Sequence, residues 1–337
     1  MVYAGTRVQF PPPPHPQSGC GCSERNVHPQ FRFFILSPGM GFRTREVSMP
    51  RACIVYFSQS GSTEKVAKGI ARGLRKAGYR IDAFNLFPAG PFPDVRGYDL
   101  IGIGLPVYYF RPPLNVLDFI RQLPPLKNVP AFIFVTKGSN IGSAGNRIRR
   151  ILKAKGAREA GYFSCWGADH FLLYLQKGYF LFPGHPDKKE LKKAESFGCE
   201  TARNVKNKKY QTFPSDPPVR GFALFLAWFF TVNFFLRLVY HRFFFVKRKK
   251  CSSCGVCVKA CPKQNIVLNR RGFPKWGMRC ILCCYCEMKC PKEAILSVMN
   301  FPAFNLLVKN FCLPATLKNP AIRYKKVVFR PGGAVRG

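Results

Sequence analysis

Hydrophobic and polar positions follow one another in short blocks through residues 53–207. The apolar run 53–57 predicts a buried parallel strand, and Val66, Ile70 and Leu74, at four-residue steps, predict a helix after it. Alternation of strands and helices predicts an α/β fold, a doubly wound five-stranded parallel sheet of order 2-1-3-4-5 with its ligand crevice outside the strand carboxyl ends. The further strands are expected at 80–86, 99–104, 131–136 and 162–166, and the further helices at 112–122, 142–155 and 188–207.

A loop rich in hydroxyl groups joins the first strand to its helix. Successive backbone N–H groups, the hydroxyls and the helix N-terminus together form a cradle suited to a phosphate monoester. The competing interpretation is an ordinary helix N-cap at Ser62 or Thr63. Neither the triphosphate loop Gly-x4-Gly-Lys-Ser/Thr nor the dinucleotide motif Gly-x-Gly-x-x-Gly is present, so nicotinamide binding is unsupported. The cradle residues are Ser58, Gln59, Ser60, Gly61, Ser62 and Thr63.

Residues 54–70 resemble the phosphate loop of flavodoxins position by position, and the resemblance implies that the loop binds FMN. The segments after the third and fourth strands resemble the two flavodoxin loops that contact the isoalloxazine ring. The resemblance makes Tyr108 the first candidate for stacking on the ring and Tyr109 the second, and Lys137 would stabilise a reduced, anionic flavin. For each of these side chains the alternative is a solvent-facing loop residue. The ring-contact candidates are Pro106, Val107, Tyr108, Tyr109, Thr136, Lys137 and Gly138.

Trp166, Asp169 and His170 follow the fifth strand and are expected to border the same crevice. Asp169 and His170 are candidates for relaying a proton to the flavin. The favoured interpretation is that they form a hydrogen-bonded structural pair.

Eight cysteines near the C-terminus form two complete copies of the spacing Cys-x2-Cys-x2-Cys-x3-Cys-Pro. This spacing is typical of two 4Fe-4S clusters, in which the fourth cysteine of each copy ligates the other cluster. The segment 251–291 resembles the bacterial two-cluster ferredoxins, which implies a small α+β domain. Structural zinc is the alternative, and it leaves both Cys-Pro endings unexplained. We assign cluster I to Cys251, Cys254, Cys257 and Cys290, and cluster II to Cys280, Cys283, Cys286 and Cys261.

One position departs from the ferredoxin pattern, because Cys284 stands where the first copy has Gly255. Cys284 is either a spare ligand, a redox-sensitive thiol or, as we favour, a small buried residue beside the cluster. The remaining cysteines form no disulfide framework, which favours a reducing, cytoplasmic location. They are Cys20, Cys22, Cys53, Cys165, Cys199 and Cys312.

The motifs divide the chain into five segments. Residues 1–48 lack periodicity and are expected to be disordered or untranslated, with translation starting at Met49. That start is suggested by Arg45-Glu46-Val47, whose codons can form a purine-rich ribosome-binding sequence. The expected segments are the 1–48 extension, the flavodoxin-like FMN domain at 49–209, a hydrophobic connector at 210–246, the ferredoxin domain at 247–298 and a basic tail at 299–337.

Within the connector, residues 222–236 are apolar except for Thr231 and Asn233. The run is shorter than the about 20 residues of a transmembrane helix. A membrane span would also separate flavin and clusters, so we expect a helix buried between domains or in a homodimer. Binding at a membrane surface is the alternative.

The chain is strongly basic, with 54 Lys and Arg against 16 Asp and Glu and a formal net charge of +38. This charge is unusual for flavodoxins and for ferredoxins. It favours an acidic redox partner, such as a ferredoxin-like protein or a reductase, over anionic lipid or nucleic acid.

The whole arrangement resembles the flavodoxin-ferredoxin fusion proteins of anaerobic bacteria and archaea. The resemblance implies an electron-transfer protein that passes electrons between FMN and two 4Fe-4S clusters and on to partner proteins. One alternative is a flavin-dependent reductase of a small molecule such as a quinone, fed by its own clusters. The other is a basic iron-sulfur regulator that binds nucleic acid, for which the chain shows no helix-turn-helix or aromatic RNA-binding motif.

Overall fold

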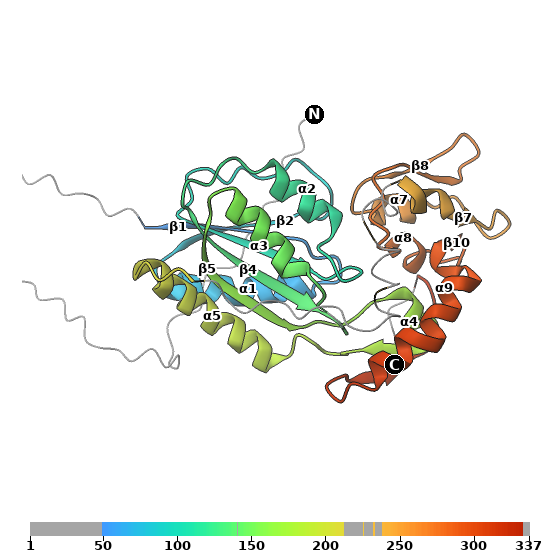
Figure 1. Ribbon diagram of the computed structural model, residues 1–337. Helices are drawn as coiled ribbons and strands as arrows, with labels where there is room; N and C mark the ends of the chain where they lie inside the picture. Colours follow the sequence, from blue (N-terminus) through green and yellow to red (C-terminus); the bar gives the residue numbers. More distant parts are fainter. Residues whose placement is uncertain (1–48, 140, 212–224, 226–231, 233–237, 333–337) are drawn as a thin grey trace, which may run out of the picture.

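The computed structural model describes residues 49–332 except Asn140 and the segments 212–224, 226–231 and 233–237 (Figure 1). The expected N-terminal extension and most of the connector therefore lie outside the described residues. In the described part of the chain, no helix combines the length and the apolar character that a bilayer crossing requires.

A five-stranded parallel sheet forms the centre of the N-terminal half, in the order β2-β1-β3-β4-β5. The predicted topology and all five predicted strands are confirmed. The strands are β1 (Arg51–Tyr56), β2 (Arg80–Asn85), β3 (Leu100–Pro106), β4 (Pro130–Lys137) and β5 (Arg158–Trp166).

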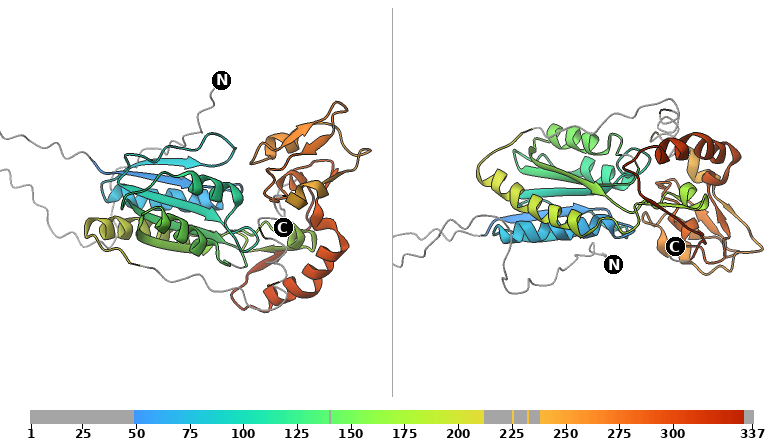
Figure 2. Two further views of the ribbon diagram at one scale, coloured as in Figure 1. Left: turned by 45° about the horizontal axis from the view of Figure 1, so that its top comes forward. Right: turned by 90° about the horizontal axis from the view of Figure 1, so that it is seen from below.

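Helices cover both faces of the sheet, as Figures 1 and 2 show. Side chains of β1 alternate between the two faces, so that Ile54 and Tyr56 belong to one buried cluster while Val55 and Phe57 belong to another. Both sets are buried because each face carries two helices. On one face lie α1 (Ser62–Lys76) and α5 (Lys188–Lys206), and on the other α2 (Leu114–Gln122) and α3 (Ala144–Ala154).

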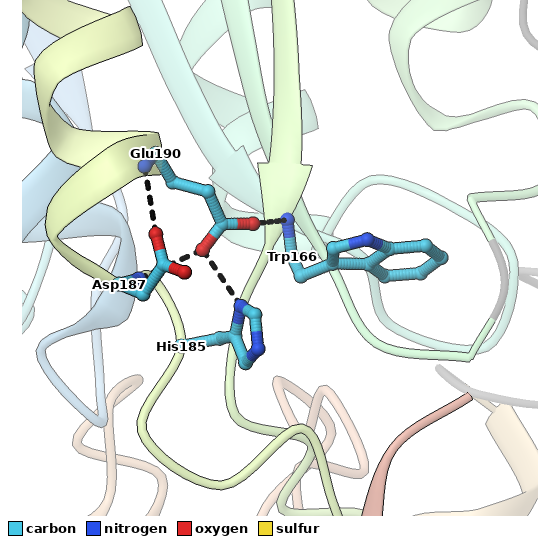
Figure 3. Close-up of polar contacts among 4 residues, drawn as sticks. All are labelled: Trp166, His185, Asp187 and Glu190. Carbon is cyan, nitrogen blue, oxygen red and sulfur yellow. Dashed lines mark hydrogen bonds and ion pairs between the residues drawn. The ribbon is translucent and has the colours of Figure 1, made fainter. Parts of the chain in front are cut away.

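A polar cluster joins the end of β5 to the start of α5 (Figure 3). Asp187 caps α5 by accepting a hydrogen bond from the Glu190 backbone N–H at 2.8 Å, and the Glu190 carboxylate accepts one from the Asp187 N–H at 2.7 Å. The same carboxylate meets His185 Nδ1 at 2.7 Å and accepts a hydrogen bond from the Trp166 N–H at 3.0 Å. Both carboxylates are therefore occupied by hydrogen bonds at the start of α5, and these bonds hold residues 185–190 beside Trp166.

Two short elements that the sequence analysis does not predict lie between β5 and α5. They are α4 (Leu172–Gln176) and β6 (Tyr179–Leu181). Strand β11 (Tyr324–Lys326), within the segment expected to be a basic tail, pairs antiparallel with β6. Residues 324–326 therefore return to the sheet-containing half.

The cysteine-rich half consists of short elements that include two antiparallel strand pairs, with β7 paired to β10 and β8 to β9. Each cysteine copy leads into a short helix, α7 or α8. The elements are η2 (Tyr240–Phe243), β7 (Phe245–Val246), α7 (Val256–Ala260), β8 (Ile266–Leu268), β9 (Pro274–Trp276), α8 (Tyr285–Met288) and β10 (Ile295–Leu296). They are followed by η3 (Val298–Asn300), α9 (Pro302–Leu307), η4 (Val308–Cys312) and α10 (Leu313–Leu317).

Candidate redox site

A cavity of about 460 Å³ lies at the carboxyl ends of the parallel strands, where the loops after β1, β3, β4 and β5 meet. Its size is typical of small-molecule sites. Eleven of the thirteen predicted FMN-binding residues line it, and Ser58 and Gly61 lie in the same loop. The eleven are Gln59, Ser60, Ser62, Thr63, Pro106, Val107, Tyr108, Tyr109, Thr136, Lys137 and Gly138.

The loop after β1 leaves backbone donors without partners. Gly61 is the N-cap of α1, with φ 88° and no side-chain cap, so the interpretation of Ser62 or Thr63 as cap residue is wrong. Ser58 Oγ accepts a hydrogen bond from the Glu64 N–H at 3.2 Å, and the Thr63 and Thr136 hydroxyls lie 2.7 Å apart. Within the described residues, the backbone N–H groups of 59–63 have no acceptor. Five free donors at a helix N-terminus form an anion-binding site.

The two tyrosines after β3 are held by hydrogen bonds from their hydroxyl groups. Tyr108 donates to Gln59 Oε1 at 2.5 Å, and Tyr109 donates to the Leu282 carbonyl at 2.6 Å. Burial raises the pKa of both phenols well above the ordinary value, so both remain protonated donors at neutral pH. Lys137 Nζ lies 4.4 Å from the centroid of the Trp166 ring, at the border of the cavity.

Asp169 and His170 both line the cavity, but their side chains contact different residues. The Asp169 carboxylate accepts hydrogen bonds from the Ser139 N–H at 3.2 Å and the Phe171 N–H at 3.0 Å. The His170 ring packs 5.2 Å from the ring of Phe180. The interpretation of the two as a mutual hydrogen-bonded pair is therefore wrong. Burial raises the pKa of Asp169 and, with the charge of Lys289, lowers that of His170, so both shifts favour the neutral forms.

The eight cysteines of the two copies surround two small cavities, and each cavity takes members of both copies. All cysteines in the described part of the chain are free. Burial raises the pKa of Cys280 to about 12 and of Cys283 to about 11, because desolvation disfavours the thiolate. The first cavity is lined by Cys251, Cys254, Cys257 and Cys290, and the second by Cys261, Cys280, Cys283 and Cys286 together with Cys284.

Cys284 is buried and its backbone is left-handed, with φ 53°. Its counterpart Gly255 has φ 70°, so the turn in both copies requires a positive φ that glycine adopts without strain. The thiol of Cys284 meets Ser297 Oγ at 3.5 Å, and it also lines the larger cavity. Cys284 also lines the second cysteine cavity, and its burial and its contact with Ser297 agree with a packed residue in the wall of that cavity.

Comparisons with known proteins bear on the N-terminal half. Residues 53–169 match the family model of the flavodoxin domain. Solved structures that match this half include an archaeal flavodoxin (18% identity, TM-score 0.37, 46% of this chain and 99% of that one) and Megasphaera elsdenii flavodoxin in the two-electron reduced form (21% identity, TM-score 0.35, 45% of this chain and 98% of that one). Rubredoxin oxygen:oxidoreductase from Desulfovibrio gigas matches at 15% identity, with a TM-score of 0.35, 48% of this chain and 37% of that one.

The flavodoxin-like domain and the cysteine-rich half meet at the large cavity. Gln59 Nε2 donates to Cys283 Sγ at 3.6 Å, and Lys263 forms an ion pair with Asp118 at 3.5 Å. Sequence reasoning missed the second wall of the cavity, because no local pattern indicates which distant segments pack together. The missed residues that line it include Cys283, Cys284, Tyr285, Met288, Lys289 and Phe329.

Proposed function

We propose that this protein is an electron-transfer protein in which FMN occupies the large cavity and two 4Fe-4S clusters occupy the two cysteine cavities. The flavodoxin-domain match and the order of the sheet support a flavin-based role. The single observation that carries the proposal is the position of Cys283, which lines both the large cavity and the second cysteine cavity. A flavin and a cluster held in these cavities would be near neighbours.

The larger cavity fits FMN in the chemistry of its walls. The free backbone N–H groups of 59–63 suit the phosphate, and Tyr108, Tyr109 and Phe329 supply aromatic surface for the ring. Lys137 contributes positive charge at the border, where a reduced, anionic flavin would gain most from it.

The spacing of the sulfur atoms supports iron-sulfur clusters over zinc. A tetrahedral zinc site with Zn–S bonds of about 2.3 Å requires sulfur atoms about 3.8 Å apart. Among the described residues, no three of the cysteine sulfur atoms lie within 4.8 Å of one another. A cube, which binds each thiolate at a different iron, accepts this wider spacing.

The positions of the two cysteine cavities also suggest the order in which electrons would pass through the two clusters. Cluster II, at Cys261, Cys280, Cys283 and Cys286, borders the flavin cavity, whereas cluster I includes Cys254, which is exposed to solvent. A flavin exchanges one or two electrons and each cube exchanges one, so electrons would pass singly between FMN, cluster II, cluster I and a partner.

Anaerobic purification followed by iron, sulfide and flavin analysis tests the proposal. We expect about eight irons, eight sulfides and one FMN per chain. Zinc without sulfide, or a chain that retains no FMN, would overturn it. Faster reduction of quinones than of carrier proteins would instead favour a small-molecule reductase.

A further inference from the structure

The outer cavity of the cysteine-rich half opens beside an exposed loop. Ser252, Ser253 and Cys254 are all exposed, and Leu268 and Lys292 line the same cavity. Strands β7 and β8 lie on the outer side of this half, away from the sheet (Figure 1). This face therefore gives a macromolecule direct access to the site assigned to cluster I.

Basic side chains lie close to this cavity, and one of them, Lys292, lines it. The exposed residues 247–250 run directly into Cys251, whose N–H donates to the Lys247 carbonyl at 3.1 Å. Arg270 and Arg271 are exposed in the turn between β8 and β9, and that turn touches the cysteine loop: a Cβ at Gly272 would lie 2.5 Å from Ser253 Oγ. We call this set the cluster I rim, made of Lys247, Arg248, Lys249, Lys250, Arg270, Arg271 and Lys292.

Little negative charge offsets the rim. Residues 247–298 contain twelve Lys and Arg and two Glu. Glu287 is buried and bound to the Ser297 N–H at 2.9 Å and to Asn300 Nδ2 at 2.7 Å, which leaves Glu293 as the exposed carboxylate of this segment. The centre of the face is apolar, since Val267 is 61% and Leu268 40% exposed. An apolar centre inside a charged rim is the usual anatomy of a protein interface.

We propose that the cluster I rim docks an acidic one-electron carrier protein. The proposal rests on the proposed function, because it requires a cluster at Cys251, Cys254, Cys257 and Cys290. In each encounter one electron crosses the interface between the two proteins. Either cluster I is oxidised by one electron and the partner's redox centre is reduced by one, or the reverse, and no atom or proton is transferred. Opposite charges speed the encounter and orient the exposed cluster toward the partner's centre.

A protein partner suits this face better than lipid or nucleic acid does. The exposed large apolar side chains described between residues 245 and 298 are Phe245, Val267, Leu268 and Met278, and they lie on short strands and a turn rather than along one amphipathic helix that could lie in a bilayer. The charge also lies next to the cysteine cavity, since Lys292 lines it and Lys250 directly precedes Cys251, a position that suits a partner that exchanges electrons.

Charge reversal tests the rim, with a matched control on the opposite half. Arg270→Glu combined with Arg271→Glu alters exposed side chains in the β8–β9 turn, and Lys192→Glu combined with Lys193→Glu makes the same charge change on the exposed face of α5. The probe is a small, acidic two-cluster ferredoxin, mixed with each protein in an anaerobic stopped-flow experiment. We expect the second-order rate constant for the rim variant to fall about tenfold at low ionic strength, and the control to change much less.

The difference between rim variant and control should disappear at about 0.5 M salt, where exposed charges are screened. Equal rates for both variants at low salt would overturn the inference, as would salt-sensitive binding of the rim to anionic vesicles or RNA in place of the ferredoxin. Iron and sulfide content of each variant shows that the clusters are intact. Their absence from the unaltered protein would instead overturn the proposed function itself.

Discussion

At the scale of single residues, Gln59 has the most informative position. It follows β1 in the phosphate loop, accepts a hydrogen bond from Tyr108 and donates one to Cys283 Sγ. A hydrogen bond donated to a cluster thiolate stabilises the more negative, reduced cluster and raises its reduction potential. Gln59 therefore links the loop expected to hold the FMN phosphate to Cys283, and it would influence the reduction potential of the proposed cluster II.

Replacing Gln59 by Leu should lower the reduction potential of cluster II. The lost hydrogen bond is worth about 1 kcal/mol, which is about 40 mV for one electron. An EPR-monitored redox titration would measure the shift. Gln264→Leu is the matched control, because Gln264 Nε2 also crosses between the halves but donates to the Ala89 carbonyl at 3.0 Å. Equal shifts in both variants would indicate a loosened interface rather than the loss of one N–H···S bond.

Replacing Cys284 tests whether this residue packs beside cluster II or serves as one of its ligands. Because its thiol is buried and contacts Ser297, Cys284→Ala should keep the full iron content and lower the free energy of unfolding by about 1 kcal/mol. Cys283→Ala, one residue earlier, should lose the iron of cluster II. Iron analysis and denaturant unfolding of both variants provide the measurements, and loss of iron from Cys284→Ala would contradict the packing role.

The raised pKa of Asp169 predicts a pH-dependent contribution to stability. Burial raises this pKa above its ordinary value of 3.8, and the two backbone hydrogen bonds oppose the shift only in part. A group whose folded-state pKa is raised stabilises the fold below its ordinary pKa, and this contribution is lost as the pH rises through the folded-state value. Asp169→Asn cannot ionise, so its Tm relative to the unaltered protein should rise over that interval and then level off. A difference in Tm that stayed constant with pH would contradict this assignment.

At the scale of elements, strong periodicity made most of the first half predictable. Val66, Ile70 and Leu74 are all buried in α1, and the apolar run 53–57 forms the buried end of β1 and the residue after it. The assignment of the two cysteine sets rests on the spacing together with the ferredoxin pattern, in which the fourth cysteine of each copy belongs to the other set, and each set lines one cavity. Elements with only three residues, such as β6 and β11, have no such pattern.

Strand β11 shows why those elements escape prediction. Its three residues are exposed, and it exists through pairing with β6, some 140 residues earlier in the chain. The Phe182 N–H donates to the Arg323 carbonyl at 2.7 Å, and Lys326 Nζ lies 3.4 Å from the centroid of the Tyr179 ring. Such long-range contacts cannot be predicted from the pattern of neighbouring residues in the sequence.

The same strand carries Phe329 to the wall of the large cavity. Phe329→Ala should therefore weaken FMN binding about tenfold, the equivalent of one aromatic contact of about 1.5 kcal/mol. Titration of the apoprotein with FMN, followed by quenching of flavin fluorescence, would measure the change. Val328→Ala is the control, because Val328 is 75% exposed and does not line the cavity.

At the scale of the whole molecule, the carboxyl edge of the sheet faces the cysteine-rich half, and strands β7 and β8 lie on the far side of that half (Figures 1 and 2). The proposed flavin and clusters would thus lie in sequence from the interior to the rim. Two kinds of electron transfer follow from this arrangement, one within the chain and one between proteins.

The two kinds of transfer should separate by their dependence on concentration and salt. Transfer between photoreduced FMN and the clusters occurs within one chain, so its rate constant should be independent of protein concentration and change little with salt, because the cavity that joins them is partly buried. Transfer to an acidic partner should rise linearly with partner concentration and fall steeply as salt is added. Laser photoreduction in the absence and presence of the partner measures both. An internal rate that rose with protein concentration would show that FMN and clusters exchange electrons between molecules, which would contradict the shared position of Cys283 as the route.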